Sequence, residues 1–270
     1  SMEVMAAASK LAVGGVAQVS ETTQVLTKLL NAYQLGAKDA ADVTDVLFTT
    51  VRLGQTTIPE LSQSLGNVAS IANTAGLSVR GLGASMAVLT RRIDTPESVT
   101  ALRGALYALA APAVEAQAKM SELGISLQRF DDGTLDLIST IKQFQGLPID
   151  TLRRVIPEAR AANAVTILAN NIGELEGALR DMNDAAGATE TAFNKIADSP
   201  AFKLQKLKAQ FTSAIISIGN ALQILVDMVT VLADKFAAFD SSTQTLTLTI
   251  AGLGIAVAKF IPVLLTMSAG

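Results

Sequence analysis

A regular apolar seam in the last third of the chain limits most strongly what this sequence can fold into. Between residues 200 and 239, large apolar residues recur at alternating steps of four and three. This spacing places them on one side of an α-helix, as in a coiled coil. We therefore predict one long helix over residues 199–240 whose oligomerisation seam consists of Ile218, Leu222, Leu225, Val229, Leu232, Phe236 and Phe239.

The predicted helix is long and poorly shielded from its surroundings. At a rise of about 1.5 Å per residue, forty helical residues span roughly 60 Å, more than a compact domain of this size requires of one element. No residue between Phe211 and Val226 is charged. A helix with so little polar surface packs on more than one side. Packing within the chain and self-association predict the same pattern, so both interpretations stay open at this point.

The composition favours an all-α protein without a reaction centre. Half of the residues are apolar, but there are only two tyrosines and no tryptophan. The chain also contains no cysteine and no histidine, which excludes disulfides, thiolate nucleophiles, Ser-His-Asp triads and His-ligated zinc. A net charge of −3 gives no general attraction to nucleic acid. We expect no enzyme activity, no metal site and no cofactor.

The first 198 residues are predicted to form an array of short antiparallel helix hairpins. Glycine lies beside an aliphatic residue at three helix ends, at Gly36, Gly76 and Gly124, about forty residues apart. A glycine at such an end supplies the left-handed conformation that terminates a helix. The spacing is compatible with a degenerate internal repeat and equally with coincidence.

Residues that favour helix starts mark the other boundaries. We predict Ser20 and Thr22 as N-caps of a second helix, and Thr95 as the N-cap of a helix that begins at proline. Thr57 and Glu60 have the spacing of a capping box, and this helix is expected to continue as far as Gly76.

Proline and small polar residues predict the interruptions. Pro112 is expected to break a helix, and Pro148 and Pro157 to bracket another. The stretch 183–191, rich in small and polar residues, is interpreted as a hinge ahead of the long helix.

The charged clusters are better explained by structure than by chemistry. Asp131 and Asp132 precede Gly133, which is typical of an ordinary turn. The basic residues could contact phosphates, but no aromatic residues lie between them, so solvated helix faces are the favoured interpretation. These residues are Arg153, Arg154, Arg160, Lys203, Lys206 and Lys208.

Residues 241–270 form a hydrophobic segment in which only Lys259 is charged. The apolar run 246–267 is long enough to cross a bilayer core as a helix, although the alternation at 245–250 is locally typical of a strand. Lys259 and Pro262 oppose permanent membrane insertion. We therefore expect a segment that is first buried in protein and can enter a membrane later, through Leu246, Leu248, Ile250, Leu253, Ile255, Val257, Phe260, Ile261, Val263, Leu264 and Leu265.

Five short strings give the chain a specific resemblance to a known family. They are LNAYQL (30–35), VLFTTV (46–51), GQTTIPEL (54–61), VTALRGAL (99–106) and KMSELGIS (119–126). In this order, and over residues 6–239, the chain resembles the core region of phage tail tape measure proteins, the minor tail protein family of long-tailed phages and prophages. The hydrophobic tail also resembles segments that follow this core in the family.

The resemblance implies a mostly helical protein of the virion tail. Such a protein fills the tail tube, sets tail length during assembly and leaves ahead of the DNA at infection. From the seam we expect a parallel oligomer of three or more copies. The resemblance adds tail tube and tail tip proteins as partners, and the host inner membrane at ejection. Because 270 residues are too few to measure a tail, we expect a fragment whose measuring repeats lie elsewhere.

A membrane-active helical toxin or pore-forming protein is the alternative from another class. In that interpretation the hairpins shield the hydrophobic segment until it meets a bilayer. An enzyme that acts on cell-wall polymers would need two positioned carboxylates, which the sequence does not offer.

Overall fold

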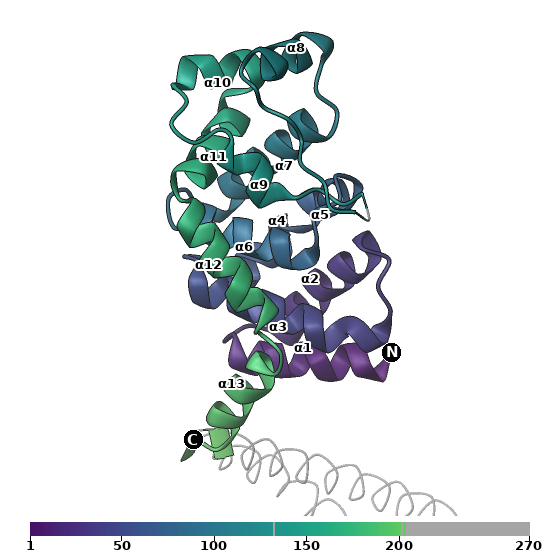
Figure 1. The fold of residues 1–270 in the computed structure, drawn as a ribbon. Helices are drawn as coiled ribbons and strands as arrows, with labels where there is room; N and C mark the ends of the chain where they lie inside the picture. Colours follow the sequence, from purple (N-terminus) through teal and green to yellow (C-terminus); the bar gives the residue numbers. More distant parts are fainter. Residues whose placement is uncertain (132, 201, 204–270) are drawn as a thin grey trace, which may run out of the picture. The chain divides into compact units, whose positions relative to one another are not determined.

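A computed structural model describes residues 1–131, 133–200 and 202–203 of the chain (Figure 1). Within these residues the structure is helical, with one isolated bridge between Arg129 and Leu135 and no named strand. The predicted all-α class is confirmed. The chain divides into two compact units, residues 1–196 and 197–270.

The helices of the first unit are short, as predicted. In chain order they are α1 (Met2–Gly14), α2 (Val19–Ala32), the 3-10 helix η1 (Ala37–Asp39), α3 (Ala40–Leu53), α4 (Ile58–Ser64), α5 (Gly66–Thr74), α6 (Val79–Thr90), α7 (Thr95–Ala110), α8 (Val114–Glu122), α9 (Leu137–Lys142), α10 (Ile149–Val155), α11 (Ala159–Asn170), α12 (Ile172–Asn183) and α13 (Ala188–Ala197), whose last residue begins the second unit.

In the second unit the description is confined to residues 197–200 and 202–203. The hydroxyl of Ser199 accepts a hydrogen bond from the backbone N–H of Phe202 (3.2 Å), and the residues that follow Ser199 in this short stretch are helical. The rest of the predicted long helix and the whole hydrophobic segment lie outside the described residues.

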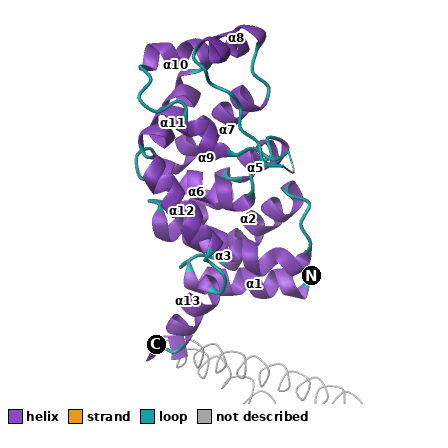
Figure 2. Ribbon diagram, in the orientation of Figure 1, coloured by secondary structure: helices purple, strands orange, loops and turns teal. Residues whose placement is uncertain are grey.

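The helices of the first unit stack in layers along one direction (Figure 2). Helix α1 packs on α2 and α3, α3 packs on α6, and α6 packs on α7 and α12. Farther along, α7 packs on α11, and α10 packs on both α11 and α8. The late helices α11 and α12 therefore run back along the early ones, and the unit closes as one fold.

One continuous apolar core runs through this stack. Leucines that are essentially fully buried come from most of the layers, for example Leu11, Leu47 and Leu106. Burying one such side chain stabilises the fold by about 1.5–3 kcal/mol. Glycine lets α6 and α3 approach closely, since a Cβ on Gly83 of α6 would lie 2.8 Å from the Thr50 hydroxyl of α3.

Four helix ends share one hydrogen-bond pattern; the sequence predicted an end near three of them and the correct left-handed residue at two. The residue after the left-handed one donates its N–H to a carbonyl five positions back, as Leu77 does to Ala72 (2.8 Å). Gly76 (φ 82°) and Gly124 (φ 70°) are left-handed as predicted. The prediction for Gly36 is wrong, because Gln34 (φ 55°) takes that conformation two residues earlier. The fourth end, which we did not predict, has Val16 (φ 50°) in this position.

The capping box at the start of α4 is confirmed. The backbone N–H of Thr57 donates to the Glu60 carboxylate (2.9 Å), and Glu60 N–H donates to the Thr57 hydroxyl (3.4 Å). The helix does not run unbroken to Gly76, however. The ammonium of Lys28 in α2 donates to the carbonyl of Ser62 (3.1 Å). In an unbroken helix this carbonyl would accept the N–H of the residue four positions later. The helix divides at this point into α4 and α5.

The other two cap predictions are wrong. Helix α2 begins at Val19, where the backbone N–H of Gln18 donates to Glu21 (2.9 Å), so Ser20 and Thr22 lie inside the helix. Thr22 is fully buried and turns its hydroxyl to carbonyls of the preceding turn.

At α7 the cap is Asp94, whose carboxylate accepts from the N–H of Glu97 (3.0 Å). The hydroxyl of Thr95 faces inward and hydrogen-bonds Thr56 (2.7 Å). A tertiary contact thus decided between two adjacent residues that both favour caps.

The predicted interruptions are confirmed at the prolines and corrected at the hinge. Helix α7 ends before Pro112, and α10 lies between Pro148 and Pro157. Helix α13 begins within the predicted hinge 183–191, so the connection is limited to residues 184–187. Gly187 (φ 78°) makes the sharp turn there.

Candidate functional surfaces

The residues predicted to carry function lie outside the described part of the chain. This holds for the whole oligomerisation seam, from Ile218 to Phe239, and for the whole membrane segment, from Leu246 to Leu265. Within residues 1–131, 133–200 and 202–203, no helix combines the length and the apolar character needed to cross a bilayer. In the same residues, no acidic cluster has a geometry that could hold a metal ion.

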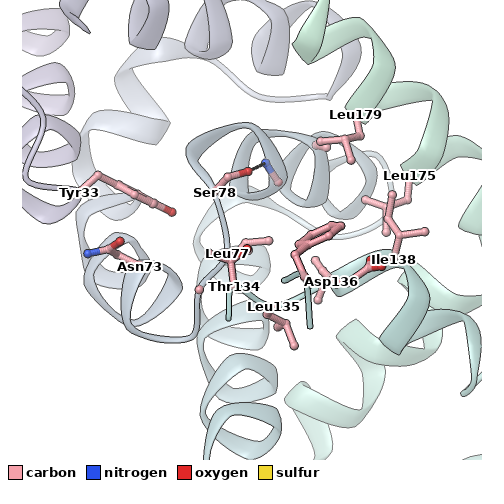
Figure 3. Close-up of a pocket in the computed structure, with 15 residues that line it drawn as sticks. Tyr33, Asn73, Leu77, Ser78, Thr134, Leu135, Asp136, Ile138, Leu175 and Leu179 are labelled. Carbon is pink, nitrogen blue, oxygen red and sulfur yellow. Dashed lines mark hydrogen bonds between the residues drawn. The ribbon is translucent and has the colours of Figure 1, made fainter. Parts of the chain in front are cut away.

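An apolar pocket of about 280 Å³ lies where distant segments of the first unit meet (Figure 3). Tyr33 and Asn73 lie on one side of it, and Leu175 and Leu179 of α12 on another. The irregular segment between α8 and α9 covers it and is fixed by a hydrogen bond from Leu135 N–H to the carbonyl of Gly76 (3.1 Å).

The polar groups around this pocket are not arranged for chemistry. The Tyr33 hydroxyl has no hydrogen-bond partner and almost no accessible surface, and burial raises the pKa of this tyrosine. Asp136 accepts from the N–H of Ser139 (3.0 Å) as the N-cap of α9. Asn73 donates to the carbonyl of Ala32 (3.0 Å). Asp136 and Asn73 therefore hold the backbone in place, and the Tyr33 hydroxyl is left without a partner.

The start of α13 is attached to α1 and α3 mainly by polar contacts. The buried carboxylate of Asp45 accepts hydrogen bonds from the N–H groups of Gly187 (2.7 Å) and Thr189 (2.8 Å). Lys10 of α1 forms an ion pair with Glu190. Thr189 is the only buried residue of α13. Ala192, one turn further along, also lies close to α1, since a Cβ on Gly14 would come within 3.2 Å of its Cβ.

A second charged cluster joins α6 to α12. Glu174 accepts a hydrogen bond from Arg92 (2.8 Å) and forms an ion pair with Arg91 (3.4 Å). The hydrogen bond from Arg92 is the main cause that lowers the pKa of Glu174; burial opposes it, and the positive charges of Arg92 and Arg91 lower the pKa further. Arg92 also donates to the side-chain carbonyl of Asn171, which precedes α12.

Two of the basic residues singled out in the sequence form surface ion pairs, whereas Lys206 and Lys208 lie outside the described residues. Arg160 pairs with Glu97 (3.5 Å) and Lys203 with Asp198 (3.5 Å), in agreement with solvated helix faces. The segment around Asp131 is a turn, as predicted, in which Gly133 (φ 84°) donates its N–H to the carbonyl of Phe130 (2.9 Å).

Sequence reasoning missed Asp45, and the pattern of α3 held no signal for it. At 100° per residue, Asp45 lies on the side of α3 opposite to the apolar stripe of Val43 and Leu47, where a charged residue is ordinarily exposed. The fold nevertheless buries Asp45, and its hydrogen-bond donors come 142 and 144 residues later in the chain. The sequence alone therefore indicated neither the burial nor the partners.

The described residues of the first unit define an all-α protein with one continuous apolar core, whose helices are also joined by polar contacts. The family described as "Phage-related minor tail protein" matches residues 1–211. The chain belongs to this family of structural tail proteins, as the resemblance predicted.

A relative among the characterised proteins supports the same assignment. The chain is similar to the "Tape measure protein" of Pneumococcus phage Dp-1, with 24% identity over 265 residues. The similarity covers 93% of this chain and 23% of that protein, so the chain spans about a quarter of its relative's length. No solved structure matches. The alternative of a membrane-active toxin finds no support in these comparisons.

Proposed function

We propose that this chain is part of a tape measure protein that occupies the tail tube, determines tail length during assembly and is released during genome ejection. The alignment of 93% of the chain with a protein named for that role carries the proposal. The role is structural and involves no catalytic step. Its partners are further copies of the chain and the proteins of the tail tube and tail tip.

The two parts of the chain differ in their suitability for setting a length. A ruler must be stiff and extended, and a helix fixes about 1.5 Å per residue whereas a flexible coil does not. Residues 1–196 bury their helices in a shared core, so this unit cannot be pulled into a rod without unfolding. We assign it the role of a folded module and assign the length-setting role to the predicted helix 199–240 together with sequence elsewhere in the protein.

Tail length in the phage that encodes the chain tests this proposal. Removing the codons for residues 204–240 is expected to shorten the tail by about 1.5 Å per residue, roughly 55 Å in all, measured by electron microscopy of purified virions. An unchanged length would contradict a measuring role for this segment. Absence of the protein from purified tails would contradict the proposal as a whole.

We further propose that three or more copies associate in parallel through the seam from Ile218 to Phe239. The heptad-like spacing and the scarcity of charge around it support this association. Light scattering of the full chain is expected to give a mass of at least three protomers, and the substitutions Leu225→Glu and Leu232→Glu together to reduce it. A monomeric mass at high protein concentration would contradict association through the seam.

The hydrophobic segment is proposed to partition into the host membrane once the protein has been released. Its apolar run, 246–267, has the length needed, and Lys259 explains why insertion is conditional. The full chain is expected to float with liposomes, and a variant without residues 246–267 to stay at the bottom of the gradient. Equal flotation of both would remove this part of the proposal.

A further inference from the structure

Helix α13 lies against the end of α1 at the edge of the first unit and takes no part in the apolar core (Figure 1). The preceding helix, α12, buries Leu175 and Met182 in that core. No residue of the fully described helix α13 belongs to it, and Phe193 and Ile196 are half-buried. Burial of large apolar side chains supplies most of the free energy that docks a helix on its neighbours. Helix α13 receives little of this contribution.

The polar contacts that hold α13 gather at its first turn. The Asp45 carboxylate accepts from the N–H groups of Gly187 (2.7 Å) and Thr189 (2.8 Å). Lys10 pairs with Glu190, but these side chains are 41% and 48% exposed, and exposed ion pairs contribute little. The buried carboxylate is therefore the main polar attachment of the helix.

The docked position also carries costs that undocking would remove. The Thr189 hydroxyl is buried without a hydrogen-bond partner, and it would bind water if α13 moved away. Beside the first turn lies an open pocket of about 530 Å³, lined in part by Ala6 and Ala7 of α1 and by Ala40 and Ala41 of α3. Because these side chains are small, the start of α13 is not enclosed by close packing as a core helix is.

The connection before α13 is suited to act as a hinge. Met182 and Ala185 are buried and fix the end of α12, whereas Ala186 and Gly187 are exposed. Gly187 has a left-handed backbone (φ 78°), and glycine passes between backbone conformations without a Cβ clash. A change at these two exposed residues can move α13 while α12 stays in the core.

We infer that α13 is a detachable strap, which Asp45 fastens to the folded unit and which swings away while the core stays folded. Local opening of this kind occurs at a lower free energy than global unfolding when few apolar contacts are lost. An isolated helix shorter than about 12–15 residues is marginal in water, so α13 loses its amide protection when it undocks. The strap goes beyond the proposed function and does not depend on it, since it concerns residues 1–196 alone.

Thiol labelling of the full 270-residue chain measures the opening, and the natural absence of cysteine makes each introduced thiol unique. Thr189→Cys places a thiol under the strap without breaking a side-chain hydrogen bond. The control is Ser85→Cys, at a fully buried position of α6. When opening and closing are faster than labelling, the rate reports the population of the open state.

Iodoacetamide is expected to label Thr189→Cys at least about a hundredfold faster than Ser85→Cys, because only the latter requires the core to open. Urea denaturation of both variants corrects the rates for any difference in global stability. Equal corrected rates would overturn the inference, since α13 would then open only together with the core.

Locking the strap provides a second test with a different readout. A Cβ on Gly14 would lie 3.2 Å from the Cβ of Ala192, close to the roughly 3.8 Å of a disulfide. Oxidation of the double variant Gly14→Cys, Ala192→Cys should therefore tie α13 to α1. Failure of this disulfide to form would contradict the docked position itself.

Hydrogen exchange of the double variant, followed by mass spectrometry, compares α13 with α11 before and after oxidation. In the reduced protein α13 is expected to exchange at least about a hundredfold faster than α11, and oxidation to narrow this difference at least about tenfold, because the strap can no longer leave. A difference that oxidation does not change would overturn the inference. Neither measurement involves tail length, so each outcome is separate from that of the proposed function.

Discussion

The carboxylate of Asp45 in α3 accepts a hydrogen bond from the backbone N–H of Thr189, the second residue of α13, at 2.8 Å. The same carboxylate accepts from the N–H of Gly187 (2.7 Å). Asp45 therefore caps a helix that begins 143 residues later in the chain, and its negative charge lies at the positive end of that helix. This carboxylate is the buried contact at the start of α13, beside the more exposed ion pair of Lys10 with Glu190.

Removing this carboxylate should loosen α13 before anything else. We expect Asp45→Ala to lower the free energy of unfolding by about 1–2 kcal/mol and to accelerate amide exchange in α13 relative to α11. Asp45→Asn retains one acceptor of similar size and should have an intermediate effect. Hydrogen exchange measured by mass spectrometry on the full chain resolves the two helices.

Asp42 provides the matched control on the same helix. Its carboxylate is half exposed and pairs with Arg80. Surface pairs of this kind contribute less than about 1 kcal/mol, so Asp42→Ala should leave α13 exchange unchanged. Equal exchange in α13 for wild type and Asp45→Ala would show that the cap does not hold the helix.

Acid should weaken the link between α6 and α12. The pKa of Glu174 is lowered by its hydrogen bond with Arg92 and by the charges of Arg92 and Arg91. A carboxylate with a lowered folded-state pKa contributes stability that is fully present above its unfolded pKa, about 4.3. That contribution is lost as the pH falls through the folded pKa.

The size of this effect is small because the pair is exposed, with 40% of the Glu174 side chain accessible. We expect Glu174→Gln to cost less than about 1 kcal/mol at pH 7 in 0.1 M salt. Urea titrations at pH 7 and pH 3 should show the two proteins converging in acid. Glu176→Gln is the control, since its lysine partner is 3.9 Å away. If wild type and Glu174→Gln differ by the same free energy of unfolding at pH 7 and pH 3, the ion pair does not contribute to stability.

Tyr33 carries a buried hydroxyl that the fold does not satisfy. Replacing it with phenylalanine removes the unpaired group and keeps the ring, so Tyr33→Phe should stabilise the protein by about 1 kcal/mol. Burial raises the pKa of Tyr33, so its contribution to stability is present below the unfolded pKa, about 10, and is lost as the pH rises above it. The advantage of the variant should therefore grow at pH 10.5.

The second tyrosine of the chain serves as the control. Tyr107 is 58% exposed, and Tyr107→Phe should change the free energy of unfolding by less than about 0.5 kcal/mol at either pH. Guanidinium unfolding curves at pH 8 and pH 10.5 provide the measurement. A destabilised Tyr33→Phe variant would mean that the hydroxyl has a partner in solution.

Local sequence signals predicted the helical class and many of the helix ends. The Thr57–Glu60 box, the prolines around α10 and the glycines at 76 and 124 all act within one helical turn. Such signals can be read without knowing the rest of the fold. Asp94 and Thr95 can both act as the N-cap of α7 by residue type. Asp94 takes this role because the Thr95 hydroxyl hydrogen-bonds Thr56 instead.

Features that depend on contacts between distant parts of the chain could not be predicted from local sequence signals. Helix α12 was not predicted, because Gly173 and Gly177 weaken a pattern that Leu175, Ala178 and Met182 otherwise support. The division between α4 and α5 depends on Lys28 from another helix. The seam and the hydrophobic segment stay predictions, since they lie outside the described residues.

Val16 is strained in a way that can be relieved. It is a β-branched residue at φ 50°, and its side chain is 86% exposed, so no packing contact compensates. We expect Val16→Gly to raise the melting temperature, corresponding to about 1 kcal/mol. Gln24→Gly is the contrasting control, because it places glycine at an exposed position in the interior of α2 and should destabilise by about 0.5–1 kcal/mol. A loss of stability in Val16→Gly would contradict the assigned conformation.

Alanine substitutions at two glycines with left-handed backbone conformation distinguish the cost of backbone strain from the cost of a steric clash. At Gly124 (φ 70°) nothing lies within 4 Å of an added Cβ, so Gly124→Ala should cost about 1 kcal/mol for the conformation alone. At Gly76 (φ 82°) the same Cβ would lie 2.7 Å from the backbone nitrogen of Leu135, which cannot move without breaking its hydrogen bond to the Gly76 carbonyl. Gly76→Ala should therefore cost at least about 1 kcal/mol more, measured by urea denaturation of the full chain. Equal losses in the two variants would mean that the segment between α8 and α9 does not lie against Gly76, because the clash is the one difference expected between them.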